Sequence, residues 1–414
     1  MGLLHKLIRL DKALMLLHKA LRPIKDFEEI EIRKTLGRIL AEDVISSIDI
    51  PPFDRAAMDG YAVRAEDTYG AEPENPKVLR VIGVSEIGDP FRGKVSAGEA
   101  VYVHTGSRIP EGADAVVPIE YVEAIGDKIL VRKMVAPGEN ISKRGEDVEK
   151  GTRILEKGQI ISPADIAMMK AIGIRKVRVV RKPKIAVMAC GSELVDNIEE
   201  LSPGKILEYS REIVIGYANK LGAETIDLGI VPDDESEILN RIQQVREKVD
   251  LLVTVGGTSV GKHDLIPHII RKYGELLFHG VSVEPGKPIC AGKMDELPIL
   301  GFPGLPVATF VATFTILIRA LERLTGVRGR YAHRTVRAVL RRKIWSKPGV
   351  RTYVRVRLIR ENNRVYAEPI MISGSGILSS VVMSDGIVVV PEELEGVEEE
   401  REVEVIVIRD SISF

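Results

Sequence analysis

A glycine-rich stretch in the middle of the chain has the residue types and spacing of a phosphate site. It is "DLLVTVGGTSVGKHD", Asp250 to Asp264, and it contains G-x-x-x-x-G-K directly after an apolar, strand-like run. A P-loop needs Ser or Thr after its lysine to hold magnesium, and this chain has His263 there. The loop amides, the hydroxyls and a following helix start still favour phosphate binding over a plain turn. The residues predicted to cradle the phosphate are Gly256, Gly257, Thr258, Ser259 and Gly261.

Four carboxylates follow strand-like runs of the same region. Glu193 lies in "CGSEL", Asp233 and Asp234 lie in "VPDD", and Asp264 ends the glycine-rich stretch. One phosphate needs less negative charge than this, whereas a magnesium ion that bridges carboxylates to a phosphorylated ligand accounts for it. Helix N-capping is the alternative role for the Ser and Asp residues, and the two roles are compatible.

Two proline-glycine turns add further groups. "EPGKP" places Lys287 on a rigid turn, where its ammonium is able to meet an oxyanion. "GFPGLPVATF" opens a helix with Pro303, Gly304 and Pro306, which exposes first-turn amides. An ordinary helix start with a well-placed proline is the alternative for this second motif.

Three motifs of the N-terminal half also carry polar groups in stiff loops. "IPPFDRAAMDGYAV" contains Asp54, Arg55 and Asp59, although a turn between strands is the stronger interpretation of its residue types. "HTGSRIPEGADAVVPIE" places Thr105 after a strand, in a nest-like loop for an oxyanion or in an ordinary turn. "KRGEDV" groups charges around Gly145, as a solvated charge cluster also would.

The pattern of apolar residues predicts which elements position these groups. From Lys184 to about Arg328, strand-like runs such as "KIAVMA", "ETIDLGIV" and "DLLVTV" alternate with helical runs such as "YSREIVIGYANKLG". This alternation predicts parallel crossovers and a doubly wound α/β domain. Ligands of such sheets bind beyond the carboxyl ends of the strands, where the motifs of this region lie.

The remainder of the chain differs in texture. After Gly329, short alternating runs such as "RTYVRVRLI" and "REVEVIVI" predict a small antiparallel barrel or sandwich. Before Lys184, a Gly- and Pro-rich region with short β-like pieces lies between two more helical stretches. This arrangement predicts a β-rich module inserted into a helical one.

The bulk composition excludes several classes of protein. The 414 residues carry a formal net charge of -1, so no bulk charge attracts nucleic acid or an anionic membrane. With two cysteines, Cys190 and Cys290, the chain supports neither a disulfide framework nor a cysteine-rich zinc site. Residues 297–318 are uncharged, but prolines and glycines leave a helix too short to span a bilayer. We expect a cytoplasmic location, and scarce Asn and Gln beside abundant Lys, Arg and Glu predict a thermophilic source.

Taken together, the motifs resemble those of the molybdopterin molybdenumtransferase (MoeA) family, to which the E domains of gephyrin and of its plant counterpart are related. "PPFDRAAMDGYAV", "HTGSRIPEGADAVVPIE", "RGEDV", "GGTSVGKHD", "EPGKP" and "GFPGLPVATF" occur in the family's order across nearly the whole chain. The resemblance implies a multidomain α/β plus β fold and an elongated homodimer with an active site shared between protomers. The domains expected of each chain are a discontinuous helical linker domain (1–47 and 142–182), an inserted β-rich domain (48–141), a doubly wound α/β molybdopterin-binding domain (183–328) and a C-terminal small β-barrel (329–414).

The resemblance also implies a reaction and a set of residues. Members take adenylylated molybdopterin, release AMP with Mg²⁺ present, and insert molybdate, or in the alternative tungstate, into the dithiolene. A MogA/MoaB-type adenylyltransferase is the candidate partner. The catalytic positions are Asp59, Thr105, Asp147, Glu193, Asp233 and Asp264, of which Glu193, Asp233 and Asp264 are the candidate metal ligands. The cofactor-binding positions are Gly256, Gly257, Thr258, Ser259, Gly261, Lys287, Pro303, Gly304, Pro306 and Ser375. Asp59 and Thr105 would act across the dimer.

Some positions depart from the family's pattern. The chain has Glu284 where relatives usually have lysine, Cys190 where they have threonine, and Leu305 where they have asparagine. Glu284 reverses a charge beside the anion site, and Leu305 removes an amide able to hydrogen-bond a ligand. Two alternatives to a molybdotransferase stay open, namely a molybdopterin-binding scaffold and a molybdopterin adenylyltransferase.

Overall fold

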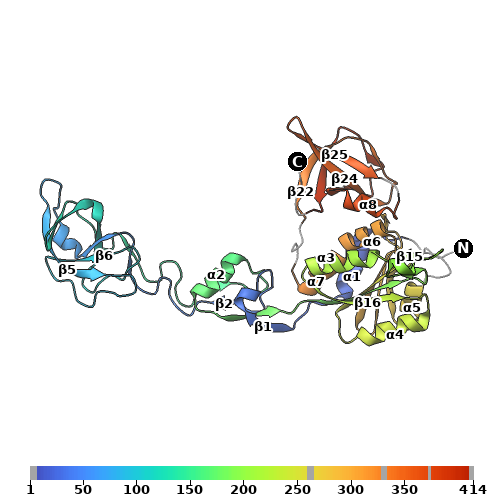
Figure 1. Cartoon of the computed structure of the whole chain (residues 1–414), viewed down its shortest axis with the longest axis horizontal. Helices are drawn as coiled ribbons and strands as arrows, with labels where there is room; N and C mark the ends of the chain where they lie inside the picture. The colour runs from blue at the N-terminus through green and yellow to red at the C-terminus, as the bar shows by residue number, and fades with distance from the viewer. Residues whose placement is uncertain (1–6, 259–264, 328–332, 372–373, 410–414) are drawn as a thin grey trace. The chain divides into compact units, whose positions relative to one another are not determined.

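The computed structural model describes residues 7–258, 265–327, 333–371 and 374–409 (Figure 1). The chain divides into two units, and each is described by itself. Unit 1 comprises Met1–Asp26 and Val180–Phe414, and unit 2 comprises Phe27–Val179.

A six-stranded sheet forms the centre of the α/β part of unit 1. Its strand order is β16-β13-β17-β21-β20-β18. The first four strands run parallel, whereas β20 and β18 are antiparallel to their neighbours. The strands are β13 (Lys184–Cys190), β16 (Glu224–Val231), β17 (Leu251–Val255), β18 (Glu275–His279), β20 (Cys290–Met294) and β21 (Leu297–Phe302).

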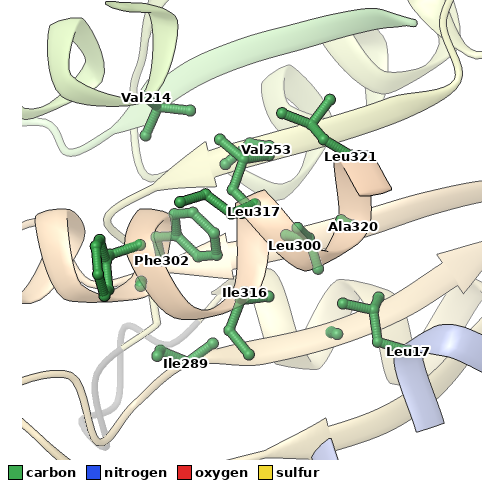
Figure 2. Close-up of a cluster of buried hydrophobic side chains, with 14 of the residues drawn as sticks. Leu17, Val214, Val253, Ile289, Leu300, Phe302, Ile316, Leu317, Ala320 and Leu321 are labelled. Atoms are coloured by element: carbon green, nitrogen blue, oxygen red, sulfur yellow. The ribbon is translucent and has the colours of Figure 1, made fainter. Parts of the chain in front are cut away.

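Helices cover both faces of this sheet. Successive strand residues point to opposite faces, and both faces carry apolar side chains that the helices bury. Val187, Val253 and Leu300 pack with one set of helices, and their neighbours Ala186, Leu252 and Ile299 pack with the other set. Figure 2 shows part of the first cluster, with Phe302 beside the helix that carries Leu317. The first set is α1 (Leu10–Ala20), α3 (Ser210–Lys220), α6 (Pro306–Ala312), the π-helix η5 (Thr313–Leu317) and α7 (Ile318–Thr325), and the second is α4 (Glu235–Val245) and α5 (Leu265–Tyr273).

The predicted alternation of strands and helices is confirmed from β13 to α5. The antiparallel edge was not predicted, because an apolar run such as "LPILGF" looks the same in either strand direction. A small excursion after β13 was missed too, since two-residue strands are too short to have a period. It contains β14 (Leu194–Val195), η4 (Ile198–Glu200) and β15 (Ile206–Leu207).

Five strands of the C-terminal part close into a barrel. Pairing runs from β24 through β25, β22, β28 and β26, and β26 pairs again with β24, so the predicted barrel is confirmed. A short strand of the α/β part, β19 (Val283–Glu284), lies parallel to the start of β24. The barrel strands are β22 (Thr335–Leu340), β24 (Arg351–Glu361), β25 (Arg364–Met371), β26 (Gly386–Val390) and β28 (Glu402–Val407), accompanied by β23 (Ile344–Trp345), α8 (Leu378–Val382) and β27 (Gly396–Val397).

Unit 2 consists mainly of short strands. A six-stranded sheet has the order β7-β4-β6-β5-β9-β8, and the pairs β1-β12, β10-β3 and β11-β2 are separate. The sheet comprises β4 (Gly60–Val63), β5 (Lys77–Ser85), β6 (Glu99–Val103), β7 (Ala115–Pro118), β8 (Val122–Ile125) and β9 (Lys128–Val131). The other elements are β1 (Phe27–Glu31), η1 (Ile32–Lys34), β2 (Val44–Ile45), β3 (Arg55–Ala56), η2 (Ala65–Thr68), η3 (Ile119–Tyr121), β10 (Ile141–Ser142), β11 (Arg153–Leu155), α2 (Pro163–Ala171) and β12 (Lys176–Val180).

The stretches on either side of the β-rich region contain more strand than the sequence suggested. In the described part of unit 2, α2 is the α-helix, and Ser162 and Asp165 form its capping box. The other expected helix, α1, packs its buried Leu10, Ala13 and Leu17 into the core of unit 1. The helical character of the N-terminal stretch predicts a helix but does not say which core it joins.

The uncharged segment 297–318 forms β21, a tight turn and the buried helix that begins at α6. Among the described residues, no helix is long and apolar enough to cross a membrane. The prolines therefore have the effect that the sequence predicted, because they divide the segment into a strand and a helix.

Candidate active site

A cavity of about 580 Å³ lies in the α/β part of unit 1, lined by the loops that follow β13, β16, β17 and β21. These strands are parallel neighbours, so their carboxyl ends meet at one edge of the sheet. The predicted site residues that line the cavity are Glu193, Asp233, Gly256, Gly257, Thr258, Pro303, Gly304 and Pro306. The predicted residues Ser259, Gly261 and Asp264 lie outside the described residues.

The glycines after β17 allow backbone to contact backbone at the base of the cavity. Gly256 has a φ of +93°, and a Cβ built on it would lie 2.3 Å from the carbonyl oxygen of Cys190. Its amide donates to the carbonyl of Phe302, at 2.8 Å. Thr258 is 1% exposed, and its hydroxyl has no hydrogen-bond partner among the described residues. An unpartnered buried hydroxyl at a cavity wall is suited to bind a ligand oxygen.

One of the predicted carboxylates, that of Asp233, is oriented by a contact between two loops. The amide of Ser192 donates to Asp233 Oδ2 (3.2 Å), and the amide of Asp233 donates to the Ser192 hydroxyl (3.0 Å). Glu193 follows directly and lines the same cavity. Asp234 has a different role, since it caps α4 by accepting from the amides of Ser236 and Glu237. The capping alternative therefore holds for Asp234, and Asp233 is the residue of this pair at the cavity.

The two cavity carboxylates fit a hard cation in part. Among residues 7–258, 265–327, 333–371 and 374–409, no three His, Cys, Asp or Glu side chains come together as a ready-made metal site. Magnesium is commonly held by one or two carboxylates together with phosphate oxygens and water. Glu193 and Asp233 supply oxygens of this kind in one cavity.

Lys287 and Ser375 lie near the cavity, although they are not among its lining residues. The Lys287 ammonium is 3.4 Å from the carboxylate of Glu284, so the unusual glutamate forms an ion pair with the predicted anion-binding lysine. Pro288, the next residue along the chain, lines the cavity. The backbone carbonyl of Ser375 accepts a hydrogen bond from the amide of Val307, at 2.9 Å, in the first turn of α6.

Sequence reasoning missed one wall of the cavity. The segment from Ile206 to Ser210 lines it, together with Leu305. Ser210 fixes this wall to the loop after β21, because its hydroxyl donates to the Gly304 carbonyl at 2.8 Å. The signal was the polar break "LEYSRE" before α3, which falls at the same sheet edge as the other loops.

In unit 2, two of the predicted site residues contact each other directly. Asp59 Oδ1 accepts a hydrogen bond from the amide of Thr105 (2.6 Å) and another from its hydroxyl (2.9 Å). These bonds, the amide bond first, lower the pKa of Asp59 below its ordinary value. Both end on one oxygen, so they orient the carboxylate without using Oδ2.

The three N-terminal motifs meet around the same loops. Asp54 accepts from the Lys143 ammonium (2.9 Å) and from the amide of Arg144 (2.8 Å), so the charges of "KRGEDV" hold "PPFDR". Asp147 is exposed, and its amide donates to the carbonyl of Ile50. The structure thus brings Asp59, Thr105 and the loop before Asp147 into one unit.

The nest-like loop at Thr105 does not have free amides. The amide of Thr105 donates to Asp59, that of Gly106 to the Ala56 carbonyl, and that of Ser107 to the His104 carbonyl. The oxyanion nest that the sequence suggested is therefore wrong. The motif positions the Asp59 carboxylate instead, and this could not be seen from the sequence because Ala56 and Asp59 lie on a distant loop.

Three family models match the chain in consecutive regions. They are described as "MoeA N-terminal region (domain I and II)", matching residues 8–173, "Probable molybdopterin binding domain", matching 186–323, and "MoeA C-terminal region (domain IV)", matching 337–408. The cavity lies within the second region, and the Asp59–Thr105 contact lies within the first.

Curated relatives and solved structures are similar over nearly the whole chain. A molybdopterin biosynthesis protein of Methanocaldococcus jannaschii is 35% identical over 93% of this chain and 93% of its own length. The molybdopterin molybdenumtransferase of Haemophilus influenzae is 33% identical over 88% of this chain and 90% of its own. The crystal structure of a molybdopterin biosynthesis MoeA protein from Pyrococcus horikoshii has a TM-score of 0.86 at 37% identity, covering 98% of this chain and 100% of that chain.

The hydrogen bonds of Asp59 predict a measurable change in its acidity. Thr105→Val removes the hydroxyl donor and keeps the amide, so the pKa of Asp59 should rise but stay below its ordinary value of about 3.9. Because the folded-state pKa is lowered, the stabilisation by this contact is present above the unfolded-state pKa and is lost as pH falls through the folded-state pKa. A carbon-13 NMR titration of the aspartate-labelled full chain measures this, with the Asp59→Asn variant identifying the signal. Thr105→Ser is the control and should titrate as the wild type does; an unchanged pKa in Thr105→Val would contradict the assigned contact.

Proposed function

The chain belongs to the MoeA family of molybdopterin molybdenumtransferases, and from this premise we propose that it inserts molybdate into adenylylated molybdopterin and releases AMP. The observation that carries the proposal is the cavity at the strand ends, where Glu193 and Asp233 meet a glycine loop. This combination suits a ligand with a phosphate group and a bound cation.

The residues of the cavity divide into two roles. The loop of Gly256, Gly257 and Thr258 would hold the phosphate part through the Gly257 amide and the buried Thr258 hydroxyl, which donate hydrogen bonds without adding charge. The Gly256 amide is used by the Phe302 carbonyl, so Gly256 contributes its backbone shape. Pro303 and Pro306 keep the loop after the neighbouring strand, β21, rigid at the same sheet edge. Cleavage that releases AMP depends chiefly on positioning and on charge neutralisation, so no nucleophilic side chain is required of the chain.

Glu193 and Asp233 would hold Mg²⁺, with Asp264 as the third candidate from the family's motif. The ion, when bound, neutralises charge on the phosphate oxygens of the substrate. The contact with Ser192 keeps Asp233 in place before any ligand arrives, which lowers the cost of assembling such a site. Whether molybdate or tungstate is the natural oxyanion is a further point that competition between the two ions in the assay would answer.

The reaction itself is the direct test. Purified chain, adenylylated molybdopterin, Mg²⁺ and molybdate should give AMP and molybdenum-bound cofactor in equal amounts. Asp233→Asn keeps the size of the side chain and removes its charge, so AMP release should fall by at least about 10-fold. Asp295→Asn is the matched control, since Asp295 is an exposed aspartate away from the cavity lining.

Each alternative function has its own outcome in this assay. A folded wild-type chain that gives neither AMP nor metal-bound cofactor would be a scaffold rather than an enzyme. Consumption of ATP with free molybdopterin, and no turnover of the adenylylated form, would identify an adenylyltransferase. Equal AMP release by the wild type and Asp233→Asn would remove Asp233 from the site.

We also propose that the active enzyme is a homodimer in which Asp59 and Thr105 of one protomer serve the cavity of its partner. Mixed expression of an Asp59→Asn chain with an Asp233→Asn chain tests this. Random pairing makes half of the dimers mixed, and each mixed dimer regains one unmodified site, so activity should return to about a quarter of the wild-type value. Sites built within one chain would show no recovery. Contact with a MogA/MoaB-type adenylyltransferase and a cytoplasmic location stay predictions.

The Glu284–Lys287 ion pair predicts a variant with better oxyanion binding. Glu284→Gln releases the Lys287 ammonium, so the KM for molybdate should fall by about 2- to 5-fold, the size expected for one partly exposed ion pair. Glu275→Gln breaks a similar pair with Lys293, of 3.3 Å, away from the cavity lining and serves as the control. Steady-state kinetics with varied molybdate measures both. A KM that stays unchanged in Glu284→Gln would exclude Lys287 from oxyanion binding.

A further inference from the structure

The cavity wall that the sequence did not predict contains a buried carboxylate, that of Glu208. Glu208 lies between β15 and α3 and lines the cavity, although its side chain is only 3% exposed. Its Oε1 accepts a hydrogen bond from the amide of Arg211, at 2.9 Å, in the first turn of α3. Its Oε2 is buried and has no hydrogen-bond partner among the described residues.

Arg211 does not satisfy this oxygen. Its Nε lies 3.6 Å from Glu208 Oε2, which is an ion-pair distance but too long for a hydrogen bond. The same guanidinium also serves Asp196, at 2.9 Å, and Asp227, at 3.3 Å. One cation is thus shared by three carboxylates. Burial is the main cause that raises the pKa of Glu208, in agreement with a poorly solvated carboxyl.

The neighbours of Glu208 favour a flat ligand with a donor edge. Leu207 and Tyr209 flank it in sequence and line the cavity, and Leu305 lines it from the loop after β21. Apolar and aromatic walls suit the faces of a heterocyclic ring, while a buried, unpaired acceptor requires N–H donors at the ring edge. The phosphate loop belongs to the same cavity, so one ligand with a ring and a phosphate group would use both parts.

Resting on the proposed function, we propose that Glu208 selects the pterin by accepting hydrogen bonds from the 2-amino group and the N3–H of its pyrimidinone edge. These two donors lie side by side, as the two oxygens of a carboxylate do. Glu208 is thus a specificity-determining residue, separate from the groups that hold phosphate and cation. It accounts for recognition of the ring by a residue outside the family motifs quoted above.

The test replaces one atom of the ligand and one atom of the protein. Binding of the phosphate ester of 6-hydroxymethylpterin and of the matching lumazine ester, in which oxygen replaces the 2-amino group, is measured by fluorescence titration. The wild type should bind the pterin ester at least about 10-fold more tightly. In Glu208→Gln, which keeps the size and the acceptor for the Arg211 amide, the preference should fall to within about 3-fold. Glu212→Gln, at an exposed position in the first turn of α3, is the control and should keep the wild-type preference.

The outcomes separate this inference from the proposed function. A wild type that releases AMP from adenylylated molybdopterin but binds both esters equally overturns the role of Glu208 alone. An unchanged preference in Glu208→Gln also overturns the role of Glu208. A wild type that neither releases AMP nor binds either ester overturns the proposed function as well. A weaker pterin affinity with unchanged preference would indicate a structural role for Glu208. Should Glu208→Gln fail to fold, the preference of the unmodified chain and that of Glu208→Asp still decide.

Discussion

The cavity depends on close contact between backbone segments at the ends of three strands. Gly256, after β17, hydrogen-bonds the end of β21 through Phe302 and touches the end of β13 at Cys190, where a Cβ would come within 2.3 Å of the carbonyl. Gly304 approaches Gly256 as well, since a Cβ on Gly304 would lie 3.5 Å from the Gly256 Cα. A side chain at position 256 would push the strand ends apart or fill the cavity. The position requires glycine for two reasons: its positive φ and its close approach to the Cys190 carbonyl.

The cavity walls carry more negative than positive charge, and this affects how an anion can bind there. The chain is nearly neutral overall, and the cavity walls carry Glu193, Glu208 and Asp233, while the nearby Lys287 is paired with Glu284. Attraction of an anion by full positive charges is therefore weak here, and under the proposed function a cation held by these carboxylates would have to supply it. A pocket of this kind favours ligands that bring both a phosphate and a cation over simple anions.

The sequence predicted the parts of the structure that depend on local signals. The strands and helices of the α/β part have clear periods, and the strand-end rule placed Glu193, Asp233 and the Gly256 loop at one edge. It did not predict Glu208, because the burial of this carboxylate depends on how the segment before α3 packs, where Arg211 contacts both Glu208 and Asp227 of β16. The error at Thr105 has the same cause, since the acceptors of this loop, Asp59 and the Ala56 carbonyl, lie some fifty residues earlier in the chain.

The predicted acidic residues are not equivalent, and their positions separate them. Asp59 is held by the amide and hydroxyl of Thr105, and Asp233 by a reciprocal pair of bonds with Ser192. Asp234 uses its carboxylate to cap α4, as aspartate at a helix start commonly does. Asp59 and Asp234 both accept through Oδ1, so the oxygen that is used does not distinguish them. Position at the cavity, more than the presence of an acid in a motif, therefore separates Asp233 from Asp234.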